Sequence, residues 1–248
     1  MVRSLLIRGM LAGVVAGLLA FAVAYVLGEP QVQAAIDFEA LLAAKDGHHA
    51  EAEIVSRGVQ RTLGLLTGTL ALGVALGGMF SLVFAYAYGR IGLAGARLTA
   101  AVLALAAFAT ITLVPFTKYP ANPPTVGDPA TIDKRTLLAF AMIAITALAL
   151  LAAVRVRAQL VQRLGSWDAT LVAGGVFIAL IGVAQLILPA VHETPANFPA
   201  DVLYRFRLAS LGINATLWLT IGLGFGAAAE RLLSPGRRRT GAPSPEPA

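Results

Sequence analysis

The sequence predicts an all-α membrane protein with six transmembrane helices and both termini in the cytoplasm. The first observation is composition: the 248 residues have a mean hydropathy of +0.78, and only 13% of them are charged. A soluble domain carries about 25% charged residues, so most of this chain is too apolar to face water. The second observation is that six segments approach the roughly 20 apolar residues that a bilayer span needs.

The six apolar segments form one transmembrane domain over residues 1–233. They lie near Ser4–Leu27, Leu63–Tyr88, Gly95–Phe116, Thr136–Val154, Ala169–Leu188 and Leu208–Ala229. Extracytoplasmic loops are expected near residues 28–60, 117–135 and 189–207. Residues 234–248 have no apolar periodicity, and we expect them to form a disordered cytoplasmic tail.

The first span could be mistaken for a signal peptide, because Arg3 and Arg8 precede its apolar run. A signal peptide has an apolar region of about 7–15 residues, and this run is longer, so a retained span is favoured. Gly9, Gly13 and Gly17 recur every four residues and predict a flat face for close helix packing. The second span repeats this pattern at Gly64, Gly68, Gly73, Gly77 and Gly78.

The distribution of lysine and arginine predicts the orientation of the chain in the membrane. A cytoplasmic N-terminus places 11 of the 19 on the inner side, where the connections are short and Arg-rich and the positive-inside rule counts most. These are Arg3, Arg8, Arg90, Arg97, Arg155, Arg157, Arg163, Arg231, Arg237, Arg238 and Arg239. Most acidic residues fall on the outer side. The formal charge of +6 therefore reflects membrane topology, and we expect no nucleic-acid partner.

The first outer loop is the longest. Pro30 stands where a first helical position would be, and a short amphipathic helix is expected to follow it on the outer surface. Its apolar side would carry Val32, Ala35, Ile36 and Leu42.

The second outer loop has no helical pattern, because its prolines each remove a backbone donor and fix φ. The third loop repeats part of it, since Pro195-Ala196-Asn197 matches Pro120-Ala121-Asn122. We expect arginines to hold loop carboxylates such as Asp128 and Asp201 and so to keep these loops in shape. The residues assigned to this structural role are Lys118, Pro120, Asn122, Asp128, Arg135, Asp201, Arg205, Arg207 and Arg61.

An arginine stands at the start of the span that follows each outer loop: Arg61, Arg135 and Arg207. Two explanations remain open. The chain could contain a threefold hairpin repeat, or each arginine could simply anchor a span end at the membrane surface.

All three histidines lie in predicted outer loops. In a helix, His48 and Glu51 would share one face, as would His49 and Glu53. Imidazole and carboxylate together suit divalent Co²⁺, Ni²⁺ or Zn²⁺. The candidate metal ligands are therefore His48, His49, Glu51, Glu53, His192 and Glu193. The alternative is that these are hydrated loop residues.

The predicted spans have no ionisable group at their centres, although ion-coupled carriers usually need such groups. Gln185 and Asn214 are their most polar residues. Hydrogen bonds across helices are the favoured explanation for both, and a transmembrane polar path is the alternative. The sequence also lacks a phosphate-binding loop, an acid pair in a span and a Ser/His/Asp arrangement. We therefore expect neither an enzyme nor a tightly bound cofactor.

Several loop motifs resemble a known family. They are Gly28-Glu29-Pro30, the acidic and histidine-containing segment 47–53, VPFTKYPANPPTVGDP over 114–129 and FPADVLYRFRLAS over 198–210. Together they look like the CbtA family, bacterial membrane proteins described as probable cobalt transporter subunits. The resemblance covers nearly all of the chain before the tail.

The resemblance implies uptake of Co²⁺, linked to cobalamin synthesis, across the inner (plasma) membrane. It also implies a small single-span partner of the CbtB type with a His-rich end. The first outer loop here has fewer histidines than in many relatives, which gives the partner's ligands more weight. The expected function is capture of the metal at the outer face. The alternative is a non-transporting scaffold or assembly protein that packs through its glycine-rich helix faces.

Overall fold

The computed structural model describes residues 1–45, 55–92, 95–124, 126–191, 193–195 and 197–233. Every regular element in these ranges is helical, as the sequence predicted. Five helical stretches are long and apolar enough to cross a membrane: Val2–Lys45, Arg57–Ala87, Ala96–Lys118, Ile132–Ile187 and Ala200–Leu233. The predicted tail lies outside the described residues.

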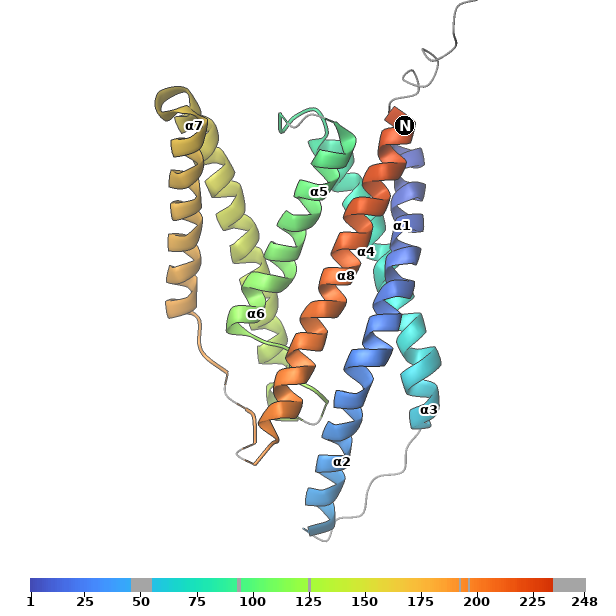
Figure 1. Cartoon of the computed structure of the whole chain (residues 1–248). Coiled ribbons are helices and arrows are strands. Elements are labelled where there is room, and N and C mark those ends of the chain that lie inside the picture. Colours follow the sequence, from blue (N-terminus) through green and yellow to red (C-terminus); the bar gives the residue numbers. More distant parts are fainter. Residues whose placement is uncertain (46–54, 93–94, 125, 192, 196, 234–248) are drawn as a thin grey trace, which may run out of the picture. The chain divides into compact units, whose positions relative to one another are not determined.

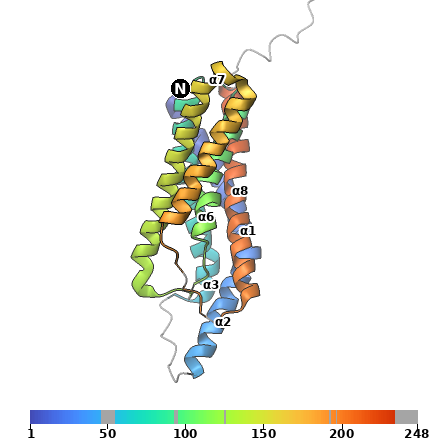
Figure 2. The same ribbon diagram turned by 90° about the vertical axis from the view of Figure 1, so that its left-hand side faces the viewer.

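Helix α7 (Ile132–Ile187) contains two of the predicted spans. As a straight helix its 56 residues would measure roughly 84 Å, against a hydrocarbon layer of about 30 Å. Gly165 interrupts the helix with φ 79° and ψ 172°, a left-handed conformation that glycine adopts without steric cost. The chain folds back there, so that α7 consists of two adjacent legs (Figures 1 and 2).

The first stretch is one continuous helix made of α1 (Val2–Val23), η1 (Ala24–Gly28) and α2 (Glu29–Lys45). The helix predicted after Pro30 is present as α2, but it continues the first span and is not a separate helix within a loop. The reason is that η1 is a π-helical turn, in which the N–H of Glu29 donates to the carbonyl of Ala24, five residues back. This wider turn gives room to the proline ring, which in a regular α-helix would clash with the preceding turn.

The same arrangement recurs in the third stretch, made of α5 (Ala96–Ala107), η3 (Phe108–Leu113) and α6 (Val114–Lys118). The N–H of Val114 donates to the carbonyl of Ala109 across a π-helical turn, directly before Pro115. Pro115 falls near the end of the predicted span Gly95–Phe116. The helix continues through Pro115 and ends at Lys118.

The chain divides into two compact units, of which the first contains Met1–Ala22, Leu63–Leu105 and the chain from Ala215 onward. Within this unit α1 packs against α4 (Leu65–Ala87) through glycines. A Cβ atom on Gly13 would overlap the carbonyl oxygen of Gly73, and one on Gly77 would overlap that of Gly9. The predicted close packing is confirmed at these positions. Gly68 faces open space and does not contribute.

Aromatic side chains fill another part of this unit. Phe225 of α8 (Ala200–Leu233) makes edge-to-face contacts with Phe80 and Phe84 of α4 at 5.5 and 4.9 Å between ring centroids. Trp218 of α8 is also buried.

The second unit comprises Val23–Thr62 and Ala106–Asn214. It contains what we call the loop cap: α2, the segment Tyr119–Thr131 with η4 (Pro129–Thr131), and the segment Leu188–Pro199. These three segments share a small apolar core of Ala35, Val126 and Phe198. Phe38 packs edge-on against Phe198 at 5.2 Å between centroids. All three predicted outer loops therefore contribute to one structure.

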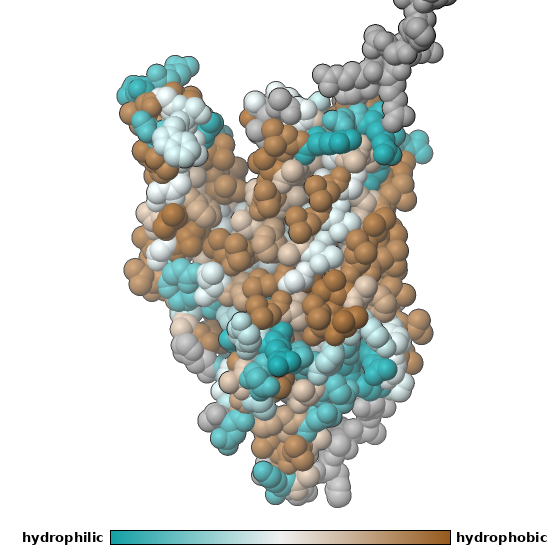
Figure 3. Space-filling model, in the orientation of Figure 1, coloured by the Kyte–Doolittle hydropathy of each residue, from teal (hydrophilic) through white to brown (hydrophobic). Residues whose placement is uncertain are grey.

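The legs of α7 expose large apolar side chains, among them Leu137, Ile178 and Leu186. Figure 3 shows this apolar surface in brown, with hydrophilic surface at the turn between the legs. Arg155, Arg157 and Arg163 are exposed near that turn, whereas the other ends of both legs join the loop cap. An apolar flank between polar ends is what a membrane-crossing hairpin requires.

Candidate functional site

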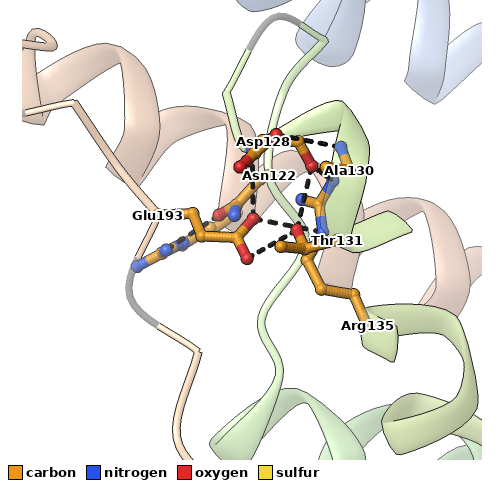
Figure 4. Close-up of polar contacts among 7 residues, drawn as sticks. Asn122, Asp128, Ala130, Thr131, Arg135 and Glu193 are labelled. Carbon is orange, nitrogen blue, oxygen red and sulfur yellow. Dashed lines mark hydrogen bonds and ion pairs between the residues drawn. The ribbon is translucent and has the colours of Figure 1, made fainter. Parts of the chain in front are cut away.

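Glu193 joins the two proline-containing segments of the loop cap (Figure 4). Its Oε1 accepts a hydrogen bond from the Thr131 hydroxyl at 2.6 Å, and its Oε2 accepts one from the N–H of Asp128 at 3.2 Å. The Nε atom of Arg135 also lies 3.2 Å from Oε2. Both carboxylate oxygens are therefore engaged within the protein.

Arg135 approaches Glu193 as an ion pair without an aligned hydrogen bond. Its buried Nε has no hydrogen-bond acceptor among the described residues, although it lies within ion-pair distance of Oε2. The Nη2 group donates to the carbonyl of Asp128 at 3.4 Å. The carboxylate of Asp128, which we had expected to pair with an arginine, accepts from the N–H of Ala130 at 2.9 Å instead. Electrostatic attraction to Glu193 therefore holds the Arg135 guanidinium more than a directional hydrogen bond does.

Gly127 leaves room for the Arg135 guanidinium. A Cβ atom there would overlap Nη1 and lie 2.8 Å from Cζ. The backbone angle φ is 122°, a value that residues with a Cβ atom rarely adopt. We expect Gly127→Ala to displace the guanidinium from Glu193 and to lower the free energy of unfolding by about 1–3 kcal/mol.

Gly92→Ala is the matched control for this prediction. Its φ of 69° is also positive, although an added Cβ is strained less there than at 122°, and nothing lies within 4 Å of that Cβ. Thermal unfolding of both variants in detergent compares the effect of backbone strain with the effect of the contact with Arg135. Equal losses of stability would mean that the contact with Arg135 does not matter.

The end of α6 is bonded to the end of α7. Lys118 Nζ donates to the carbonyl of Gln185 at 2.6 Å, and Gln185 Nε2 donates to the Thr117 hydroxyl at 2.6 Å. The hydroxyl of Tyr119 donates to the carbonyl of Pro189 at 2.8 Å, and burial raises the pKa of this phenol above its usual range. Gln185 thus makes hydrogen bonds between two helix ends.

Arg207, near the start of α8, holds the second loop through neutral groups. Its Nη2 donates to Oδ1 of Asn122 at 2.9 Å, and its Nε donates to the carbonyl of Ala121 at 3.4 Å. Further along α8, Asn214 accepts a weak hydrogen bond of 3.5 Å from Thr112 in η3. Gln185 and Asn214 each bond to another helix. A transmembrane polar path through them remains a prediction.

The arginines that follow the three predicted outer loops have different partners. Arg61 lies over the ring of Tyr25, with its Cζ atom 5.9 Å from the ring centroid, whereas Arg135 contacts a carboxylate and Arg207 an amide. Asp201 and Arg205 are exposed, and Pro120 lines the cavity described next. The ion pair of Arg57 with Glu29 could not be predicted from the sequence, because the two residues lie 28 positions apart.

A cavity of about 1200 Å³ opens within the second unit. The segment from Thr117 to Gly127 and the starts of α7 and α8 form most of its wall. Lys118, Arg135 and Arg207 contribute its charged side chains. The three cations were predicted to hold the loops in shape, and no sequence pattern predicted that they share a cavity.

Glu193 is the only predicted metal ligand that the structure describes. The other five, His48, His49, Glu51, Glu53 and His192, lie outside the described residues. Within the described ranges, no three imidazole or carboxylate groups come together to bind a metal. Because both oxygens of Glu193 are engaged, this residue would have to exchange an internal contact to bind a cation directly.

Comparison with known proteins identifies the family. No curated protein and no solved structure matches the chain. A family model described as a probable cobalt transporter subunit (CbtA) matches residues 2–230, which is nearly the whole chain before the tail. A transporter subunit with several long apolar helices is a multi-pass membrane protein that works with other subunits. The chain therefore belongs to the CbtA family of probable cobalt transporter subunits.

Proposed function

We propose that this chain captures Co²⁺ at the outer face of the inner membrane for uptake into the cell. The observation that carries the proposal is the position of Glu193, which is fixed within the loop cap and directly follows His192 in the sequence. The segment with His48 and His49 follows α2, which packs into the same apolar core. Ni²⁺ and Zn²⁺ suit the same ligands and are alternative cargoes.

The orientation in this proposal follows from α7. If each leg is counted as a span, the chain crosses the membrane six times, which puts both termini on the same side. We assign that side to the cytoplasm because the connections there are Arg-rich. The Arg-rich turn at Gly165 then faces the cytoplasm, in agreement with the positive-inside rule, and the loop cap faces outward.

In this mechanism Glu193 acts mainly by positioning. Its contacts with Thr131 and Asp128 fix the backbone beside His192, and the imidazoles replace water molecules around the arriving ion. Carboxylates on the outer loops raise the local cation concentration. A small single-span CbtB-type subunit with a His-rich end would supply further ligands.

Uptake of radiolabelled cobalt by cells tests this proposal. The combined change His48→Ala, His49→Ala and His192→Ala is expected to lower the initial rate at limiting metal by about tenfold or more, since losing metal contacts commonly costs 10–100-fold in affinity. The assay is run with the chain alone and with the small partner.

Glu39→Ala is the control, because it removes an exposed carboxylate of α2 and no imidazole. The amount of each variant in the membrane is measured in parallel. Unchanged uptake by the triple variant, at equal protein amounts, would rule out capture by these histidines.

A further inference from the structure

The cavity of the loop cap has a positively charged wall. Lys118, Arg135 and Arg207 line it, and none of the described residues in its wall is an aspartate or a glutamate. Its volume of about 1200 Å³ can hold an organic ion together with water molecules. A bare divalent cation would be repelled by these three charges.

Two of the three cations have neutral partners. Lys118 is held by the carbonyl of Gln185, and Arg207 by the carbonyl of Ala121 and the amide of Asn122. Neither belongs to an ion pair within the part of the chain that the structure describes. Neutral acceptors orient a cation without cancelling its charge. Arg135 differs, because Glu193 lies beside it.

These contacts leave hydrogen-bond donors for a ligand. An ammonium group has three N–H donors and a guanidinium group has five, and the neutral contacts use one donor of Lys118 and two nitrogens of Arg207. Hydroxyl groups of Thr136 and Thr194 add polar surface, and Phe206 adds an apolar wall. The cavity thus combines cationic, polar and apolar surface.

We propose that this cavity binds a small polycarboxylate anion. A guanidinium group matches the geometry of a carboxylate, and an ammonium group binds a second one as a point charge. Two cations without acidic partners therefore favour a ligand with more than one carboxylate. The ligand is either the free anion or its complex with a divalent metal that retains a negative charge. The proposal does not depend on capture of metal by the histidines.

Isothermal titration of citrate into the purified full chain in neutral detergent tests the site. We expect binding that weakens as ionic strength rises, and that is about 10–100-fold weaker in Lys118→Gln and in Arg207→Gln, because each removes a charge-assisted contact. Lys134→Gln is the matched control: it makes the same charge change at an exposed side chain that does not line the cavity. The uncharged triethyl ester of citrate should not bind.

Repeating the titration with the cobalt–citrate complex shows whether the site binds the free anion or its metal complex. Tighter binding of the complex than of citrate would make the metal complex the ligand, and the reverse order would make it the free anion. Absence of binding by both would overturn the proposal. So would equal weakening by Lys118→Gln and Lys134→Gln. Either result leaves the cobalt uptake test of the histidines unaffected, so the two proposals can fail separately.

Discussion

Replacing Gly77 by alanine is expected to reduce sharply the amount of folded protein that can be extracted from the membrane. The added Cβ would overlap the carbonyl oxygen of Gly9 and lie 2.9 Å from the Cα atom of Gly13. These are backbone atoms of α1, which cannot rotate away as a side chain could. The two helices would have to separate along the whole glycine face, at a cost of about 3 kcal/mol or more.

Gly68→Ala is the control, because it makes the same change in the same helix where nothing lies within 4 Å. Alanine favours the helix over glycine by about 1 kcal/mol, so this variant should be at least as stable as the unchanged protein. The measurements are the yield of monodisperse protein in detergent and its thermal midpoint. If both variants behaved alike, the close packing of α1 on α4 would be wrong.

Replacing Glu193 by alanine is expected to loosen the loop cap. The change leaves the Arg135 guanidinium without its counter-charge and removes the acceptor for the N–H of Asp128. Thr131 loses one of its two acceptors and keeps the carbonyl of Asp128. The side chains of Arg135 and Glu193 are 26% and 17% exposed, so solvent reduces the loss, which we expect to be about 2–3 kcal/mol.

Amide hydrogen exchange in the segments Tyr119–Thr131 and Leu188–Pro199 measures this loosening. Glu193→Gln keeps a hydrogen-bonding side chain but loses the charge, so its exchange rates should lie between those of the alanine variant and the unchanged protein. Asp133→Ala, at an exposed carboxylate of α7, should have no effect. Unchanged exchange in Glu193→Ala would mean that this residue does not position the cap.

The scaffold alternative was suggested by the glycine faces. In the structure Gly9, Gly13, Gly73 and Gly77 contact one another within a single chain. This face is therefore occupied by intramolecular packing, and no described feature favours the scaffold over a transporter subunit.

Hydropathy was sufficient to predict an all-helical chain, and glycine spacing predicted faces for close packing on the first two spans. The pairing of these two faces with each other is seen only in the structure. The helices continue through Pro30 and Pro115 for a common physical reason. Proline normally ends a helix, but here a π-helical turn precedes each one and lets the helix continue. Such a turn is a backbone adjustment without a composition signal, so residue patterns could not predict it.

The candidate site was predicted in part. Its loops and cations are visible in the sequence, because prolines and charges stand out between apolar spans. The partner of each cation was not predicted, because tertiary packing brings the partners together: Arg135 contacts Glu193 in a cap whose loops share the core of Ala35, Val126 and Phe198. One feature of the sequence could have indicated that packing. Val126 and Phe198 are apolar residues in loops that otherwise consist mostly of prolines and polar groups.

The direction in which α7 crosses the membrane tests the central claim most directly. The chain has no cysteine, so Thr194→Cys in the loop cap and Gln162→Cys near the Arg-rich turn each introduce a single thiol at an exposed position. We predict that a membrane-impermeant maleimide labels Thr194→Cys on intact spheroplasts and labels Gln162→Cys only after permeabilisation. The opposite pattern would place the loop cap in the cytoplasm and contradict capture of the metal at the outer face.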